Sequence, residues 1–317
     1  MSQPVADSAP KASRELTAIA VMAALLVVAP FVLYPYFLAQ ALCFALFACA
    51  FNLLVGYSGL LSFGHALFFG AAAYFAAHMA REWGWPIEAA IPLAALAAAA
   101  LGLLAGVVSI RRQGIYFSMI TLALAQMVYF IALQVPFTHG EDGIQGVQPG
   151  KLFGLVDLSQ PLNLYFFVLA IFLAGILAIY RIVHSPFGAV MRATRENEPR
   201  AISLGYRTDR YKLAVFVLSA GLSGLAGATK AIVAQSASLT DVHWSMSGEV
   251  ILMTLVGGMG TISGPALGAF IIIAMQDYLS SLGQWVTVIQ GAIFIFCVLA
   301  FRRGLIGELA ARLKVSL

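Results

Sequence analysis

The chain has 317 residues, of which 61% are hydrophobic and 10% are charged, and its mean hydropathy is +0.92. This composition excludes a soluble protein, because soluble chains contain about 45–50% apolar and about 25% charged residues and expose much of their surface to water. A membrane β-barrel is disfavoured, since its strands alternate apolar and polar residues. The apolar runs here are continuous, so the sequence predicts an all-α, polytopic membrane protein.

Ten apolar segments have about the length of a membrane helix, which is roughly 20 residues. They cover residues 16–37, 39–56, 62–80, 86–109, 114–135, 162–181, 211–234, 248–258, 265–282 and 285–301. The eighth is too short to cross a bilayer alone. Because the first is long and no convincing cleavage site follows it, we expect an uncleaved helix rather than a signal peptide. The expected organisation is a polar tail (1–15), one transmembrane domain (16–301) and a basic tail (302–317).

Basic residues set the expected orientation, because loops rich in Lys and Arg stay in the cytoplasm. With ten spans and a cytoplasmic N-terminus, 15 of the 18 Lys and Arg residues lie inside, and Arg81, Lys151 and Lys230 lie outside. Both termini are therefore expected in the cytoplasm. The formal net charge of +4 has the same explanation, so no nucleic-acid partner is expected.

Two hydrophilic connections are longer than a turn between helices requires. The outer one, 136–161, is rich in Gly and Pro and predicts a structured periplasmic loop; contact with another protein and a plain connection are both open. The inner one, 182–210, has helix starts at Ser185-Pro186 and near Pro199, with Gly205 at a helix end. Its mixed acidic and basic residues favour docking of a cytosolic protein over binding of anionic lipid headgroups.

Glycine interrupts two apolar segments, 52–72 and 253–269. Irregular backbone at membrane depth must be buried in protein or line a wet path, so such segments indicate a transporter's path. The alternative is close helix packing through small residues. Their similar Gly spacing leaves an internal duplication and a chance match both open. The expected path residues are Asn52, Gly56, Gly59, Ser62, Gly64, His65, Glu249, Gly257, Gly258, Gly260, Gly264 and Pro265.

Few polar residues lie within the spans. His65 follows the first interruption, and a hydrogen-bonded structural role and a direct role in transport are both open. Lys230, Glu249 and Asp277 fall near predicted outer ends, where solvation at the rim of the membrane is the simpler explanation.

Motifs for catalysis and nucleotide binding are missing. The sequence has no G-x-x-x-x-G-K-[ST] loop, no metal-ligand spacing, no nucleophile elbow and no paired carboxylates, so we expect no enzymatic activity and no metal or cofactor on this chain. A gradient-driven carrier usually keeps ionisable residues at mid-membrane, and this chain keeps almost none. The pattern favours a separate ATPase as the motor.

Five stretches together resemble the LivM-type permease subunits of branched-chain amino-acid ABC importers. They are Asn52–Tyr74, Gly114–Leu124, Gly140–Gly146, Ser185–Gly205 followed by Arg210–Gly227, and Glu249–Gly268. The resemblance implies a bacterial inner-membrane protein that works with a LivH-type permease, two cytosolic ATPase subunits that bind ATP and Mg²⁺, and a periplasmic solute-binding protein.

The resemblance also implies that 185–205 contains the coupling helix that docks on the ATPase. The residues implied in coupling are Phe187, Arg192, Arg195, Glu196, Asn197, Glu198 and Gly205. The loop departs from the family's Glu-Ala-Ala pattern, since it reads Glu198-Pro199-Arg200-Ala201, and this leaves the contact residues open. Urea, amides and aromatic acids are solutes of related permeases. The expected function is import of branched-chain or other hydrophobic amino acids, and the alternative is a gradient-driven carrier or channel without an ATPase.

Overall fold

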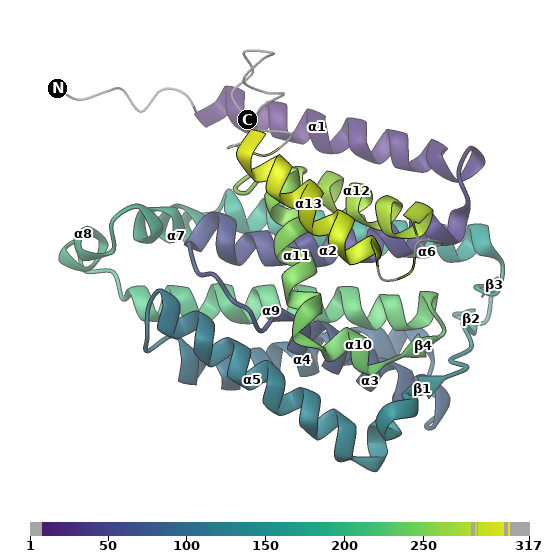
Figure 1. Ribbon diagram of the computed structural model, residues 1–317. Helices are drawn as coiled ribbons and strands as arrows, with labels where there is room; N and C mark the ends of the chain where they lie inside the picture. The colour runs from purple at the N-terminus through teal and green to yellow at the C-terminus, as the bar shows by residue number, and fades with distance from the viewer. Residues whose placement is uncertain (1–7, 280–282, 284, 301–303, 305–317) are drawn as a thin grey trace.

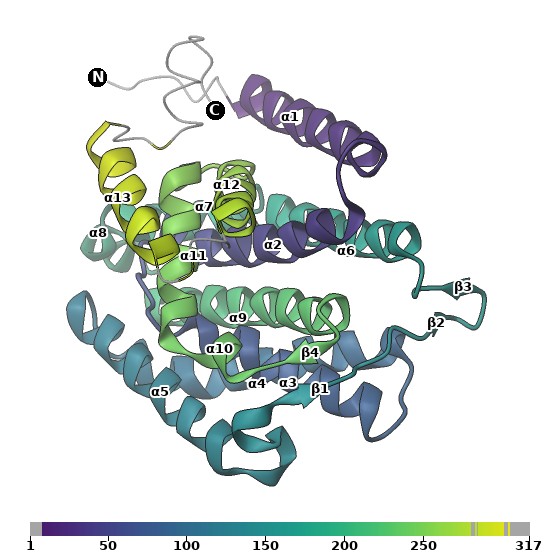
Figure 2. The ribbon, with the colours of Figure 1, turned by 45° about the vertical axis from the view of Figure 1, so that its right-hand side comes forward.

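Each of the ten apolar segments contains a helix in the computed structural model, which describes residues 8–279, 283, 285–300 and 304. The helices that correspond to these segments are α1 (Ser8–Val28), α2 (Pro35–Ser58), α3 (His65–Arg81), α4 (Ile87–Ser109), α5 (Ile115–Gln134), α6 (Pro161–Val183), α9 (Thr208–Val233), α11 (Trp244–Gly257), α12 (Gly264–Leu279) and α13 (Trp285–Ala300). The long helices lie side by side in one bundle, with α1 at its periphery (Figures 1 and 2).

Short elements fill the connections between these helices. They are η1 (Ala29–Phe31), η2 (Pro136–Thr138), η3 (Gly140–Asp142), α7 (Pro186–Glu196), α8 (Glu198–Ser203), α10 (Leu239–Val242) and the strands β1 (Ile144–Gln145), β2 (Lys151–Leu152), β3 (Val156–Asp157) and β4 (Ser236–Ala237). Two antiparallel pairs form, β1 with β4 and β2 with β3.

The expected single helix over 16–37 is wrong. Helix α1 ends at Val28, and a 3₁₀ turn containing Pro30 separates it from α2, which begins at Pro35. Proline lacks a backbone N–H and breaks a helix interior, but it suits the first turn of the next helix. In the predicted tail 302–317, Gly304 approaches Gly258, and the other residues lie outside those that the structure describes.

Five of the described helices, α2, α4, α5, α6 and α9, are long and apolar enough to cross a membrane. The chain is thus a multi-pass, all-α membrane protein. Within the most apolar window, 89% of α2 is buried but only 33% of α4 and 28% of α5. Other helices surround α2, which explains why it is apolar on all sides. Helices α4 and α5 instead have apolar faces that no other helix of the described residues covers, and such faces suit contact with lipid.

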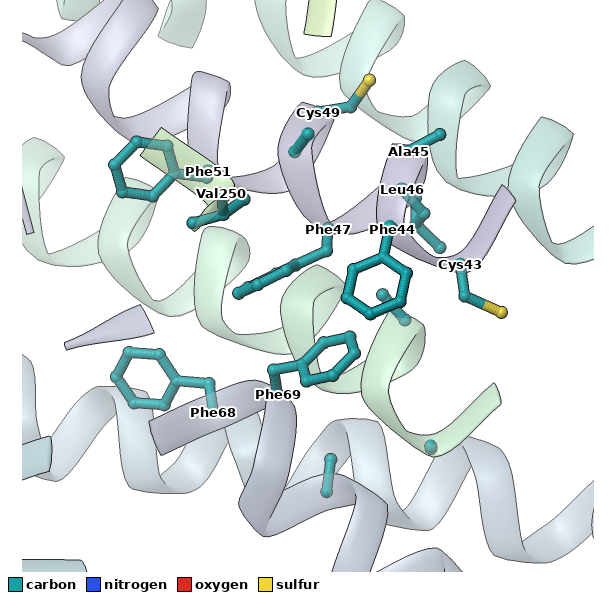
Figure 3. Packing of buried hydrophobic residues seen from close by; sticks show 14 of the residues in the cluster. Cys43, Phe44, Ala45, Leu46, Phe47, Cys49, Phe51, Phe68, Phe69 and Val250 are labelled. Atoms are coloured by element: carbon teal, nitrogen blue, oxygen red, sulfur yellow. The ribbon is translucent and has the colours of Figure 1, made fainter. Parts of the chain in front are cut away.

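Aromatic rings and small residues fill the core around α2. Phe69 of α3 lies against Phe47 and Phe44 of α2, with ring centroids 4.5 and 5.7 Å apart (Figure 3). Between α4 and α9 the contact is made by small residues, since a Cβ on Gly224 would collide with the Cβ of Ala98. Close backbone approach of this kind is usual between membrane helices.

The two hydrophilic connections lie at opposite ends of the bundle (Figure 1). Helices α7 and α8 project from one end, which we name the hairpin end. The strands β1 to β4 lie at the other, which we name the loop end; the β2–β3 hairpin extends beyond the helices there (Figure 2).

Candidate functional site

The two glycine-interrupted segments meet at the hairpin end. Asn52, near the end of α2, donates through Nδ2 to the carbonyl of Thr261 over 2.8 Å, and the backbone N–H of Gly260 donates to Asn52 Oδ1 over 2.9 Å. One amide side chain thus ties α2 to the irregular stretch between α11 and α12. We name residues 56–64 and 257–264 together the glycine junction.

Two glycines show why the junction needs residues without a Cβ. Gly59 ends α2 at φ +75°, a left-handed conformation that L residues rarely adopt. A Cβ on Gly257 would collide with the Gly264 carbonyl and lie 3.0 Å from Pro265 Cα. Close helix packing is therefore a property of the same glycines that were expected to line a path, and the two interpretations are not exclusive.

Helix α7 reaches this junction through an arginine. The guanidinium Nη1 of Arg195 donates to the carbonyl of Gly56, in the last turn of α2. The Arg195 stem packs over Gly59, where its Cγ lies 3.1 Å from the position a Cβ would take. Arg192 makes a similar but local bond, since its Nη1 donates to the Val183 carbonyl at the end of α6 over 3.1 Å. Cations suit helix C-termini, where carbonyls lack helical partners.

Most of the other expected coupling residues hold the hairpin in place. Glu198 accepts from Lys212 Nζ over 2.5 Å, from Thr208 Oγ1 over 3.1 Å and from Gln113 Nε2 over 3.0 Å. Asn197 caps α8 by accepting from the N–H of Arg200 over 3.1 Å.

Two further expected coupling residues shape the hairpin, and a third is exposed on its surface. Phe187 stacks on Tyr211, with ring centroids 5.6 Å apart, and Gly205 follows α8 at φ +89°. Glu196 is exposed. Sequence reasoning did not identify Lys212 as the partner of Glu198, although a basic residue that follows a segment with several carboxylates is a signal for such a pair.

The tip of the hairpin carries an apolar surface that the charged pattern did not predict in full. Ile202, Leu204 and Tyr206 are 55%, 70% and 42% exposed, and the exposed Arg200 and Arg207 flank them. Helix α8 projects beyond the long helices (Figure 1), and these residues lie in it or directly after it. A water-exposed apolar patch with a polar rim is typical of a protein–protein contact.

His65 has a structural environment. The imidazole is fully buried, stands nearly perpendicular to the rings of Phe51 and Phe68, and its Nε2 lies 2.8 Å from Ser219 Oγ. Ser219 donates its own proton to the Ala50 carbonyl over 2.6 Å, so we infer that His65 donates through Nε2. These bonds connect α3, α9 and α2, and they favour the hydrogen-bonded role.

Most of the remaining expected path residues lie in the glycine junction, and Glu249 lies outside it. Ser62 accepts from the N–H of Gly64 over 3.2 Å and is fully buried, and Gly258 takes φ +118° directly after α11. Pro265 occupies the first turn of α12. Glu249 lies apart: it accepts from Gln276 Nε2 over 3.2 Å between α11 and α12.

A cavity of about 540 Å³ adjoins the first interruption. Its lining is mostly apolar and comes from the junction, from the start of α5 and from α11: Gly59, Leu60, Leu61, Phe63, Gly114, Ile115, Phe117, Ser118, Met119, Leu122 and Trp244. Its volume lies in the usual range for small-molecule sites, about 300–1,000 Å³.

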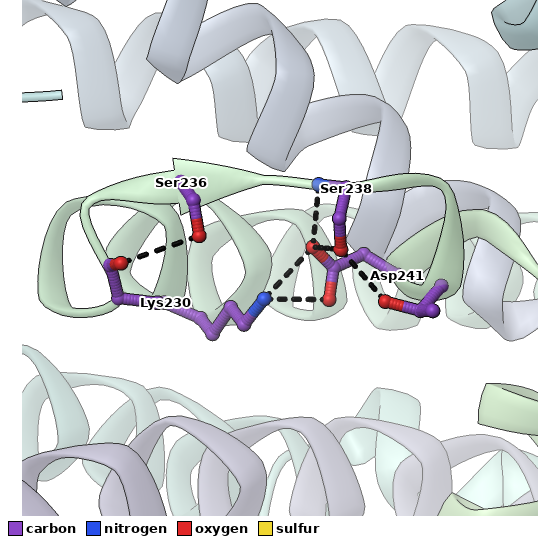
Figure 4. A network of polar contacts seen from close by, with 6 residues as sticks. Lys230, Ser236, Ser238 and Asp241 are labelled. Carbon is purple, nitrogen blue, oxygen red and sulfur yellow. Dashed lines mark hydrogen bonds and ion pairs between the residues drawn. The ribbon is translucent and has the colours of Figure 1, made fainter. Parts of the chain in front are cut away.

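The loop end is closed by a buried ion pair (Figure 4). Lys230 Nζ lies 2.7 and 2.8 Å from the two carboxylate oxygens of Asp241, and the Ser238 N–H donates to the same carboxylate over 3.1 Å. Lys230 is 9% exposed and Asp241 1%, so solvation at the rim is the wrong explanation for Lys230. Sequence reasoning missed Asp241 because its partner lies a turn and a strand away.

The fold and the junction define a multi-pass α-helical membrane protein with interrupted helices. Over residues 33–298 the chain matches the family described as "Branched-chain amino acid transport system / permease component", and it belongs to that family. This agrees with the resemblance carried by the five sequence stretches.

Curated relatives carry several solute names. The chain is 26% identical over 249 residues to the high-affinity branched-chain amino acid transport system permease protein LivM of Escherichia coli K12, covering 71% of this chain and 59% of that protein. It is 27% identical over 202 residues to the autoinducer 2 import system permease protein LsrC of Salmonella typhimurium, covering 60% and 55%. It is 29% identical over 222 residues to the L-arabinose ABC transporter permease protein AraH of Azospirillum brasilense, covering 64% and 61%.

The chain thus spans about three-fifths of the length of these relatives. No solved structure matches it at a significant level.

Proposed function

We propose that this chain is a permease subunit of an ATP-binding-cassette importer in the bacterial inner membrane. In this proposal it crosses the membrane ten times with both termini in the cytoplasm, so the hairpin end is cytoplasmic and the loop end is periplasmic. Family membership and the placement of the two hydrophilic connections at opposite ends of the bundle support it.

The observation that carries the proposal is the exposed apolar tip formed by Ile202, Leu204 and Tyr206. Apolar side chains held in water beyond the helix ends favour a cytosolic protein partner, and an ATPase subunit is the partner that this family predicts. The tip then makes the contact, while Arg192, Arg195 and Glu198 hold the hairpin against the membrane helices and Asn197 caps α8 within the hairpin.

The proposed assembly contains a second, LivH-type permease, two ATPase subunits and a periplasmic solute-binding protein. ATP and Mg²⁺ are bound by the ATPase subunits, and this chain binds no cofactor. The solute leaves the binding protein at the loop end and passes along a path that includes the glycine junction.

A branched-chain or other hydrophobic amino acid is the proposed solute. The names of the relatives include an amino-acid, an autoinducer and a sugar system, so the resemblance leaves several classes open. The apolar lining of the cavity beside the junction favours a solute with a hydrocarbon side chain over a sugar.

The test is reconstitution of the complex purified through a tag on this chain. Uptake of L-leucine into proteoliposomes should require both ATP and the periplasmic binding protein. Leu204→Asp should remove the ATPase subunits from the purified complex, whereas Phe153→Asp, at an equally exposed apolar side chain of the loop end, should retain them. Uptake by this chain alone, without any ATPase, would contradict the proposal and support a gradient-driven carrier.

A further inference from the structure

Arg195 connects three parts of the molecule that are far apart in the sequence. Its guanidinium binds the Gly56 carbonyl, 139 residues away along the chain, and its stem lies over Gly59. The same Nη1 lies 4.0 Å from the position that a Cβ would take on Gly260. One side chain of the cytoplasmic hairpin therefore lies against both glycine-interrupted segments.

Asn52 joins the two segments through its side-chain amide. It lies one helical turn before Gly56 and holds the backbone of Gly260 and Thr261 by two hydrogen bonds. The end of α2 is therefore bonded directly to the stretch between α11 and α12. Arg195 acts at the last turn of α2, directly next to this link.

The hydrogen bond of the neighbouring Arg192 differs from that of Arg195. Arg192 bonds Val183, nine residues away along the chain, so its hydrogen bond ties α7 to the helix that precedes it. The two arginines lie on one short helix and both bond a helix C-terminus, but Arg195 bonds one that belongs to the glycine junction.

We propose that Arg195 is a positioning residue that transmits movement of the α7–α8 hairpin to the glycine junction, and not a residue that contacts the ATPase. This inference rests on the proposed function, because it takes the hairpin to be the element that an ATPase moves. It assigns docking to the tip and transmission to Arg195.

The experiment measures transmission without using a solute. Met259, which is 45% exposed between Gly258 and Gly260, is replaced by Cys in a chain whose Cys43, Cys49 and Cys297 are changed to Ala. The rate of its modification by a maleimide is measured in the complete complex, with and without ATP and vanadate. The variants are Arg195→Met, which keeps the stem over Gly59 and removes the donor, Arg195→Lys, which restores a donor, and Arg112→Ala as an exposed control at the same end.

The expected result separates binding from transmission. Arg195→Met should retain the ATPase subunits and ATP hydrolysis but lose most of the ATP-dependent change in the modification rate. Arg195→Lys should recover part of that change, and Arg112→Ala all of it. Loss of the ATPase subunits from Arg195→Met, or an unchanged response, would overturn the inference.

A failure of the proposed function gives a different result. In that case the parent complex, which carries only Met259→Cys and the three Cys→Ala changes, shows no associated ATPase, and ATP does not alter the rate at which its introduced thiol is modified.

Discussion

The two ends of the bundle are held together by different chemistry. At the loop end, Lys230 and Asp241 form a buried ion pair in which both partners are side chains, and β1 pairs with β4 beside it. At the hairpin end, Arg195 and Asn52 bond backbone groups of interrupted helices. Separating the ion pair would leave two charges in a medium of low dielectric, whereas water can replace a bond to a part-buried carbonyl.

This difference suggests a division of labour. We expect the loop end to move as one body and the bonds of the hairpin end to be exchanged. Transport needs an element with two arrangements, and the hairpin end has the bonds that permit them.

The largest expected effect comes from opening the ion pair. Asp241→Ala leaves Lys230 charged and buried, and removing one partner of such a pair costs about 3–5 kcal/mol of stability. Unfolding can be followed by a thiol-reactive dye, because Cys43 and Cys49 are buried in the folded chain. The double variant Lys230→Met, Asp241→Leu should recover much of the loss. Equal unfolding temperatures for Asp241→Ala and the parent would show that the loop end is not fixed by this pair.

Removing the amide that ties the two interruptions should have a smaller effect. Asn52→Ala deprives the Gly260 N–H and the Thr261 carbonyl of their partner, and unsatisfied groups of this kind cost about 1–3 kcal/mol. The same dye assay measures it, with Asn163→Ala at the loop end as the control. Uptake should fall more than stability does, and an Asn52→Ala complex with normal uptake would contradict a link through this residue.

Two glycines of α11 provide a matched pair. Gly257→Ala forces a methyl group into the backbone of Gly264, and overpacking of this kind costs about 1–3 kcal/mol. Gly248→Ala, in the same helix, meets no atom of the described residues within 4 Å and should be neutral or slightly stabilising. Comparing their unfolding temperatures and leucine uptake isolates the close approach at the junction. Similar behaviour of the two variants would rule out steric control there.

The smallest effect is expected at the exposed β2–β3 hairpin of the loop end. The N–H of Ser159 donates to the Asp157 carboxylate over 2.9 Å, and this bond lowers the pKa of Asp157 below its ordinary value. A lowered carboxyl pKa stabilises the turn above the unfolded-state pKa, and the effect is lost as the pH falls through the folded-state pKa. Asp157→Asn should therefore raise the amide exchange rates of residues 150–160, relative to the parent at the same pH, by the same factor at pH 6 and at pH 8. A difference between these two pH values would point to another titrating group.

Local chemistry made much of the fold predictable. Continuous apolar runs located the helices, and Ser185-Pro186 located the start of α7, where the Ser185 hydroxyl accepts from the Gly188 N–H. The break before α2 was missed because the apolar run continues through Pro30 and Pro35. Hydropathy averages over a window, and proline acts at a single position.

The partners within the site were less predictable, because they depend on contacts between distant segments. The glycine spacing pointed to residues 52–64 and 257–264, which meet in the structure, but nothing local shows that Asn52 bonds Thr261. Arg195 was expected as a charge on a docking surface, and its bond to Gly56 follows only from the way α7 packs on α2. Charge patterns indicate which residues need a partner, and the tertiary structure decides which partner they find.

The central claim is that the hairpin end rearranges while the loop end stays intact, and spin-label distances test it directly. One pair of labels, at Glu196 and Met259, spans the glycine junction; a second pair, at Gln145 and Thr240, lies within the loop end, and all four positions are exposed. In the complete complex, trapping with ATP and vanadate should shift the distance between the first pair and leave the second unchanged. A shift within the loop end, or an unchanged distance across the junction, would contradict the account.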